Sequence, residues 1–266
     1  MTDSSAATPE FSIITVCLND SAGLLSTIAS VESQTFASYE HVIMDGGSTD
    51  ESVEIIRDYA ARSSHVRWVS EKDKGIFDAM NKASRLARGQ VLLYLNSGDS
   101  LSDPGVLRRV HDSRNEQAWK WAYGCLRYVN EKRELVGAAV QIPFRKRRLE
   151  FGINFVPHQA MFIDREWFFE LGEYDENFPL NSDQDLAIRA AQEEVPGVLT
   201  DFVTDFLVGG AHENFTMYGR EKSYHLMRKK TDTLFLGSAL ADRVFFMSVA
   251  AFRRLRRIAS RFKGGV

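Results

Sequence analysis

Carboxylate and amide side chains follow apolar, strand-like segments between residues 11 and 99. In chain order they are Asn19, Asp45, Asp73, Asn96 and Asp99. Such side chains can bind a divalent cation, accept a hydrogen bond from a nucleotide base, or take a proton from a hydroxyl group. The repeated placement of polar groups at strand ends therefore predicts a ligand-binding edge.

The second half of the chain contains two further candidates for chemistry. The segment Asn181–Arg189 places Asp183 and Asp185 in the first turn of an expected helix. Acids there are favoured by the helix dipole, so capping is the alternative to a role as general base. His158 and Gln159 form a polar pair between apolar segments. A structural role is the alternative for this pair.

Two short turns could bind a substrate or simply shape the chain. The turn Asp45–Asp50 lacks both the glycine spacing of a dinucleotide fingerprint and a Gly-Lys-Ser/Thr sequence. It offers Asp45 as an acceptor for a base N–H, or it is only a tight turn in which Asp50 caps a helix. The turn Asn96–Asp99 could hold a cation with substrate phosphates, or could be an Asx-type turn.

The elements that must position these residues alternate between strands and helices. Strands are expected at 11–18, 39–44, 66–69 and 91–95, with amphipathic helices between them. This alternation predicts βαβ units and a mostly parallel, doubly wound α/β sheet with helices on both faces. Ligands of such sheets bind at the carboxyl ends of the strands, where the polar residues lie.

Composition and charge limit the classes of protein that the chain can be. The 266 residues are 44% hydrophobic and 26% charged, which is typical of a globular chain. No apolar run approaches the ~20 residues of a membrane span, and we expect no signal peptide. Cys17 and Cys125 are expected to be buried free thiols of a reducing compartment.

The charge is unevenly distributed between a body and a tail. Residues 241–266 carry seven Lys or Arg and one Asp, a net charge of +6, so the total of −3 leaves −9 for residues 1–240. An acidic body disfavours nucleic acid as a partner. We expect a polar lead at 1–10, one domain at 11–230 with halves 11–103 and 104–230, and a basic helical tail at 231–266.

The tail has an apolar stripe beside its arginines. The stripe is formed by Ala241, Phe245, Ser248, Phe252, Leu255, Ala259 and Phe262. An interfacial helix on an anionic membrane has this pattern. Packing on the domain or on a second subunit, as in a homodimer, is the alternative, because amphipathicity alone does not separate the two.

Five motifs in a fixed order resemble the family 2 bacterial glycosyltransferases with the GT-A fold. They are Ser12–Val16, Asp45–Asp50, Asp73–Asn81, Leu95–Asp99 and Asp183–Arg189. The similarity spans residues 11 to 215 and is closest to the branch that assembles cell-surface polysaccharides and glycolipids. It implies a GT-A fold, a nucleotide-sugar donor, inversion at the anomeric carbon, and Mg²⁺ or Mn²⁺.

The resemblance also implies a role for each matching residue. Asp183 is the catalytic base, and Asp99 binds the metal, with His212 as a second candidate ligand. The donor residues are Thr15, Asn19, Asp45, Asp73, Asp78, Asn81, Asn96 and Ser97. The acceptor-side residues are His158, Gln159, Asp185 and Arg189. Asn96 and Gly98 depart from the family because many members have acids there, which leaves Asp99 as the one carboxylate ligand.

The sequence therefore predicts an inverting, metal-dependent glycosyltransferase. The donor is a nucleoside-diphosphate sugar, UDP-sugar being favoured over GDP- or dTDP-sugar, and the acceptor is a hydroxyl of a glycan or lipid-linked glycan. We expect a cytoplasmic protein, peripheral on the inner face of the membrane through 241–266. The alternatives are a carbohydrate-binding protein on a decayed scaffold and a sugar-phosphate nucleotidyltransferase, whose Gly-rich, basic triphosphate loop is absent at Asn19–Leu25.

Overall fold

The computed structural model describes residues 8–178, 181–209, 217–249 and 251. Within them, nine strands form one sheet in the order β3-β2-β1-β4-β8-β6-β9-β5, with β7 paired to β6. The strands are β1 (Phe11–Cys17), β2 (Tyr39–Asp45), β3 (Val66–Ser70), β4 (Val91–Tyr94), β5 (Ser100–Leu101), β6 (Trp121–Val129), β7 (Leu135–Ala139), β8 (Met161–Asp164) and β9 (Gly197–Leu207). His212 and residues 252–266 lie outside the described part.

Strands β1 to β4 form the parallel half of the sheet. β1 is buried along its whole length and pairs in parallel with β2 on one side and with β4 on the other. β3 extends this half in parallel beyond β2. A strand buried on both faces reads as a continuous apolar run, which is why the sequence indicated it clearly.

The other half of the sheet mixes strand directions. β8 lies antiparallel between β4 and β6, while β9 runs parallel to β6 and antiparallel to β5. The predicted α/β fold is confirmed, and the sheet is mixed rather than mostly parallel. The physical reason is β8, which enters the sheet straight from the turn at 158–160 without a crossover helix.

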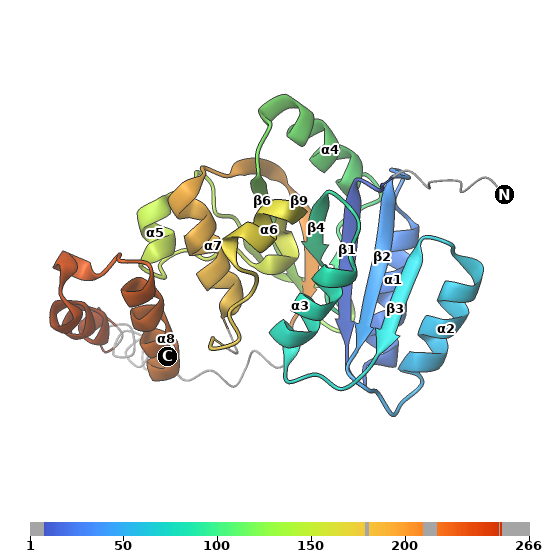
Figure 1. The fold of residues 1–266 in the computed structure, drawn as a ribbon, viewed down its shortest axis with the longest axis horizontal. Coiled ribbons are helices and arrows are strands. Elements are labelled where there is room, and N and C mark those ends of the chain that lie inside the picture. Colours follow the sequence, from blue (N-terminus) through green and yellow to red (C-terminus); the bar gives the residue numbers. More distant parts are fainter. Residues whose placement is uncertain (1–7, 179–180, 210–216, 250, 252–266) are drawn as a thin grey trace, which may run out of the picture. The chain divides into compact units, whose positions relative to one another are not determined.

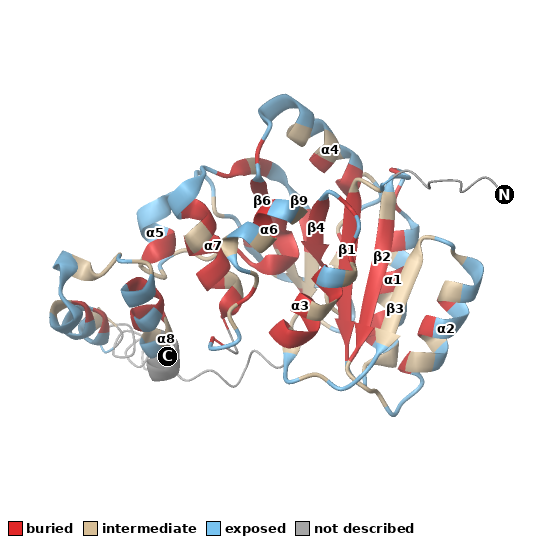
Figure 2. Cartoon of the chain, viewed as in Figure 1, coloured by how far each residue is buried: buried red, intermediate tan, exposed pale blue. Residues whose placement is uncertain are grey.

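Helices cover both faces of the sheet (Figure 1). They are α1 (Ser21–Glu32), α2 (Ser52–Arg62), α3 (Ile76–Leu86), α4 (Val106–Gln117), α6 (Arg165–Leu171) and α7 (Ser182–Glu193). Two further helices, α5 (Lys146–Glu150) and α8 (Met217–Lys230), belong to a separate compact unit described below. Phe11 and Val91 belong to one core cluster with Val110 of α4. On the opposite face, Tyr94 contacts Phe168 of α6. Figure 2 shows the buried residues concentrated in β1, β2 and β4.

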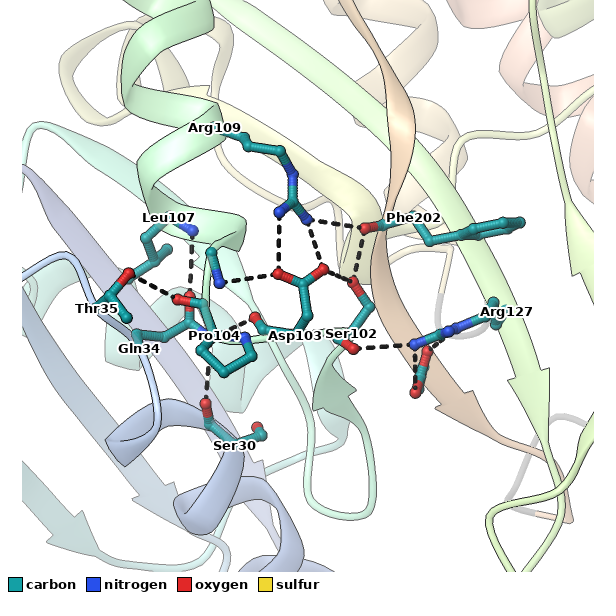
Figure 3. A network of polar contacts seen from close by, with 12 residues as sticks. Ser30, Gln34, Thr35, Ser102, Asp103, Pro104, Leu107, Arg109, Arg127 and Phe202 are labelled. Atoms are coloured by element: carbon teal, nitrogen blue, oxygen red, sulfur yellow. Dashed lines mark hydrogen bonds and ion pairs between the residues drawn. The ribbon is translucent and has the colours of Figure 1, made fainter.

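A polar network joins the end of α1 to the start of α4 and to β9 (Figure 3). Asp103 accepts a hydrogen bond from the Gly105 N–H at 2.8 Å and two from the Arg109 guanidinium. Gln34 at the end of α1 donates to the Asp103 carbonyl at 2.8 Å, and Ser102 donates to the Phe202 carbonyl at 2.6 Å. These bonds hold the segment that follows Asp99 against three elements.

The chain divides into two compact units. The first comprises residues 1–145 and 155–209, and the second comprises 146–154 and 210–266. α8 belongs to the second unit. The reason is its buried contacts: Arg228 of α8 pairs with Asp242 at 2.8 Å, and Tyr224 lies against Gly152.

The described part of the tail is helical over residues 239–249. Asp242 and Phe246 form its buried side, whereas Phe245, a member of the predicted stripe, is 41% exposed. The stripe residues Phe252, Leu255, Ala259 and Phe262 lie outside the described part. In the described residues, no helix combines the length and apolarity that crossing a bilayer requires.

Candidate active site

The polar strand ends of the parallel half lie next to one another. Asp45 ends β2 opposite Cys17 in the β1–β2 register, and the Ser97 N–H donates to the Val16 carbonyl at 3.1 Å. The Glu71 N–H donates to the Asp45 carbonyl at 2.9 Å. The three loops that follow β1, β2 and β4 are therefore brought together at one edge, as the strand pattern predicted.

Asp45 is a buried carboxylate with one free acceptor atom. Its Oδ2 accepts hydrogen bonds from the N–H groups of Gly47 and Ser48 at 3.0 Å and from the Ser70 hydroxyl at 2.6 Å. Its Oδ1 is buried and has no partner among the described residues. A buried acceptor without a hydrogen-bond donor destabilises the folded protein, and a ligand N–H that donated to it would remove this cost.

Asn19 and Ser97 shape the loops at this edge. Asn19 has a left-handed backbone with φ of 51°, and its Oδ1 accepts from the Thr49 N–H at 2.8 Å. Its own N–H donates to the Ser48 hydroxyl at 2.8 Å. Ser97 donates to the Asp20 carboxylate at 2.7 Å. Both residues were predicted to bind the nucleotide-sugar donor, and in the structure both fix the backbone of the loops at this edge.

Asp73 and Asp78 border the same edge. Asp73 lies so close to Gly46 that a Cβ there would stand 2.5 Å from its Oδ2, so a side chain at position 46 would collide with it. Asp78 accepts from the Lys74 N–H at 2.9 Å and pairs with Lys82 at 3.3 Å. Burial opposes ionisation of Asp78, yet these two partners outweigh it and its pKa lies below the usual range.

Thr15 and Asn81 have their polar atoms engaged within the protein. The Thr15 hydroxyl donates to the Leu95 carbonyl at 2.7 Å and contacts His41. Asn81 makes two bonds to the Tyr174 backbone, at 2.9 and 3.0 Å. Both residues were predicted to bind the nucleotide-sugar donor, but in the structure their contacts connect elements of the protein to one another.

Asp99 is the most perturbed acid at the edge. It is 4% exposed, and its Oδ1 accepts from the Leu207 N–H at 3.0 Å. Burial raises the pKa of its carboxyl to about 7, against the opposing effects of Leu207, His158, Gln159 and Arg133. A nearby cation would stabilise the ionised form of such a carboxylate.

His158 links Asp183 to Asn96. His158 Nδ1 lies 3.2 Å from the Asp183 Oδ2, and its Nε2 lies 3.0 Å from the Asn96 Nδ2. An amide nitrogen can only donate, so Nε2 accepts and the ring proton sits on Nδ1, facing the carboxylate. His158 is 2% exposed, and its ring also meets Phe77 edge-on. The structure thus joins Asn96, which was predicted to bind the nucleotide-sugar donor, to His158 and Asp183, which lie in the predicted acceptor half.

Gln159 lies beside Asp99, whereas Asp185 and Arg189 are engaged elsewhere. The Gln159 side chain is 2% exposed and hydrogen-bonds to Asp99. Asp185 is fully buried and pairs with Arg189 at 2.8 Å. Arg189 also donates to the Glu173 carbonyl at 2.6 Å. The contacts of this ion pair join α7 to the end of α6 rather than to the strand ends.

The residues at Asp99 fit a divalent cation held together with a substrate. In the described residues, no group of three or more His, Cys, Asp or Glu side chains could hold a metal by itself. Mg²⁺ typically takes one or two carboxylates and completes its shell with phosphates and water. Asp99 is a buried carboxylate whose pKa is raised by burial, and a bound cation would offset that effect. His212 lies outside the described part of the chain.

Three contributors to the site were not predicted from the sequence. Asp20 accepts from Ser97 and also from the Gly23 N–H at the start of α1. Its place next to Asn19 after β1 was an available signal. The Leu207 N–H carries no side-chain signal, and Arg133 acts on Asp99 from a turn far away in the sequence.

The sequence model of glycosyl transferase family 2 matches residues 12–172. An uncharacterized glycosyltransferase of Mycobacterium tuberculosis is 34% identical over 187 residues, which are 69% of this chain and 69% of that protein. A PGL/p-HBAD biosynthesis glycosyltransferase of Mycobacterium bovis is 33% identical over 199 residues, covering 74% of this chain and 75% of the relative. The chain belongs to glycosyl transferase family 2.

Solved glycosyltransferases have the same fold. Staphylococcus aureus TarS 1-349 in complex with UDP-GlcNAc matches with a TM-score of 0.66 and 15% identity, over 83% of this chain and 66% of that one. The mannosyltransferase PcManGT from Pyrobaculum calidifontis, in complex with GDP-Man and Mn²⁺, matches with a TM-score of 0.61 and 17% identity, over 84% and 64%. The predicted GT-A fold is confirmed.

Proposed function

We propose that this glycosyltransferase moves a sugar from a nucleoside-diphosphate sugar to a hydroxyl group of a glycan or glycolipid, with inversion at the anomeric carbon. The observation that carries the proposal is the hydrogen-bonded series Asp183–His158–Asn96. It connects a carboxylate at the start of α7 with the strand end that holds Asp99. In a single displacement at the anomeric carbon, the base acts on the incoming hydroxyl on one side and the diphosphate leaves from the other. The base and the diphosphate site therefore have to lie on opposite sides of that carbon.

Asp183 acts as the general base in this proposal. It accepts the proton of the acceptor hydroxyl while the hydroxyl oxygen bonds to the anomeric carbon and the bond to the diphosphate breaks. His158 orients the carboxylate through its Nδ1 proton. One displacement without a covalent enzyme intermediate inverts the configuration.

The donor half binds the nucleotide diphosphate. In this proposal the free Asp45 Oδ1 accepts an N–H of the base, and Asp99 would hold Mg²⁺ or Mn²⁺ together with the donor diphosphate. When bound, the cation supplies positive charge to the leaving diphosphate. We favour a UDP-sugar over a GDP- or dTDP-sugar. TarS binds UDP-GlcNAc and PcManGT binds GDP-Man, and both support a nucleotide-sugar donor.

A glycan or lipid-linked acceptor is supported by the relative named for PGL/p-HBAD biosynthesis. Membership of glycosyl transferase family 2 favours transfer over the nucleotidyltransferase alternative. Asn96, the departure that suggested a decayed scaffold, has a defined partner in His158. We place the protein in the cytoplasm, where its two buried free thiols would remain reduced.

Thermal shift and hydrolysis assays test the proposal together. The purified chain is heated with UDP, GDP or dTDP, each with MnCl₂ or with EDTA, because binding to the folded state raises the melting temperature. Release of UDP from UDP-sugars is measured in parallel. One nucleotide should stabilise the chain in Mn²⁺, and its sugar conjugate should be hydrolysed or transferred. Stabilisation without turnover of any donor would favour the carbohydrate-binding alternative.

The metal role of Asp99 has its own test. Asp99→Asn should weaken binding of the stabilising nucleotide in Mn²⁺ by about tenfold or more, but change it little in EDTA, because the amide is a poor ligand for a hard cation. Asp112→Asn, an exposed acid of α4, is the matched control. Equal affinity of parent and Asp99→Asn in Mn²⁺ would remove Asp99 from the metal site.

A further inference from the structure

The second unit contains a cationic pocket that the proposed transfer reaction does not use. It opens to solvent. Its lining residues come from α8 and the helix at 239–249. They are Glu221, Lys222, His225, Arg228, Arg243, Phe246 and Met247.

Arg228 gives this pocket an unsatisfied donor. Its Nε and Nη2 donate to the Asp242 carboxylate at 2.8 and 3.0 Å, and its guanidinium lies 3.8 Å from the centre of the Phe246 ring. Its Nη1 is buried and has no hydrogen-bond partner among the described residues. A fully buried guanidinium with one free nitrogen is suited to a phosphate oxygen.

The charges around Arg228 favour an anion. The carboxylate of Asp242 is neutralised by Arg228 and lies 2.6 Å from His225 Nδ1. Among the other lining residues, Lys222 and Arg243 are cations and Glu221 is the single acid. The pocket therefore presents excess positive charge around a buried donor.

An exposed apolar row adjoins the pocket. Leu240, Val244 and Met247 follow one another at four- and three-residue steps on the helix, so they share one face. Their exposed fractions are 73%, 59% and 44%. Met247 belongs to both the row and the pocket lining. An anion bound in the pocket would thus have apolar side chains beside it, as a lipid headgroup at a membrane surface does.

We propose that this pocket binds the phosphate of an anionic phospholipid headgroup while Leu240, Val244 and Met247 enter the lipid surface. Lys222 and Arg243 attract the headgroup, and the free nitrogen of Arg228 donates to a phosphate oxygen. The inference is independent of the sugar-transfer proposal, because none of its residues belongs to the candidate active site.

Flotation of the full chain with vesicles tests the headgroup site. The chain should bind vesicles of phosphatidylcholine with phosphatidylglycerol, and bind pure phosphatidylcholine much more weakly. Lys222→Gln with Arg243→Gln should reduce binding by about tenfold or more, since each basic residue contributes near an anionic leaflet. The matched control, Lys229→Gln with Arg57→Gln, changes the charge equally at exposed positions outside the pocket and should lose much less.

Two outcomes of this flotation would overturn the proposal. Equal binding to both kinds of vesicle would show that the pocket does not recognise the anionic headgroup. An equal loss in the control pair would show diffuse attraction rather than a site.

A second pair of measurements separates lipid from free phosphate. Leu240→Ser with Val244→Ser should abolish vesicle binding but keep the rise in melting temperature that glycerol phosphate produces in the parent chain. Stabilisation of the parent by glycerol phosphate without any vesicle binding would assign the pocket to a soluble phosphate and overturn the lipid proposal.

Discussion

Among single residues, Asp183 offers the most direct test of whether the candidate site is catalytic. Asp183→Asn retains the shape of the side chain and an oxygen that can still accept the hydrogen bond of the Gln184 N–H. Loss of a general base should lower turnover by about 10²- to 10⁴-fold while the melting temperature and donor affinity change little. Steady-state kinetics, a thermal melt and a donor titration measure the three quantities.

The control for this substitution must be another acid in a first helical turn. Asp185 is unsuitable, because it is buried in the ion pair with Arg189 and its neutralisation would destabilise α7. Glu166 is exposed in the first turn of α6, and Glu166→Gln should leave turnover unchanged. If Asp183→Asn keeps more than about a tenth of the parental turnover, capping explains Asp183 better than base catalysis.

His158 is a positioning residue in the same site. His158→Gln should lower kcat by about 10- to 100-fold, as loss of an orienting hydrogen bond commonly does, with little change in the donor KM. The melting temperature should change little, so that the loss appears in kcat alone. His111→Gln, at a ring that pairs with Glu10, is the control. An unchanged kcat, or a fall in kcat no larger than that of the control, would make His158 merely structural.

At the scale of elements, the buried His41 of β2 makes the first unit sensitive to acid. His41 contacts the Thr15 hydroxyl at 2.9 Å and the Tyr59 hydroxyl at 3.4 Å. Burial, assisted by His65, lowers its pKa to about 3. The unfolded chain therefore binds a proton between about pH 6.5 and 3 that the folded chain does not bind, so stability falls as the pH falls through this window.

Replacing His41 should reduce this acid sensitivity. The parent loses about 1.4 kcal/mol per pH unit from this group below pH 6.5, and His41→Gln should lose that much less. Urea unfolding at pH 7, 6 and 5 measures the free energy of unfolding of both chains. Parallel pH dependences in the two chains would show that His41 is protonated when folded.

The parallel half of the sheet was predictable and the other half was not. Strands β1 and β4 are continuous apolar runs ended by Asn or Asp, so both their type and their order followed from the sequence. β8 has only four residues, and its antiparallel pairing with β4 and β6 joins segments about 40 to 70 residues apart. No local pattern specifies such a pairing, because it depends on which edge is free when the sheet assembles.

At the scale of the whole molecule, a buried ion pair holds the second unit together. Arg228 and Asp242 are both fully buried, and they join α8 to the helix at 239–249. Asp242→Asn would leave the guanidinium buried without a counter-charge, at a cost of about 3 to 5 kcal/mol. The backbone amides of α8 should exchange hydrogen faster, by the factor that corresponds to this loss of free energy.

The control for that measurement is another Asp of the same unit. Asp232 is exposed with a left-handed backbone, which Asn also adopts readily. Asp232→Asn should therefore leave the exchange at α8 unchanged. If Asp242→Asn protects α8 as well as the parent does, the pair does not stabilise this unit.

The family resemblance, the fold class and the strand-end positions of the candidate residues can all be inferred from the amino-acid sequence alone. These follow from local patterns, because hydrophobic periodicity and turn residues act over a few positions. The three-dimensional arrangement is needed to see that His158 joins Asp183 to Asn96, and that Asp185 is held by Arg189. It also shows that Asp242, read as part of a basic tail, is buried against Arg228. Such contacts depend on distances between segments far apart in the chain, which packing sets and local pattern does not.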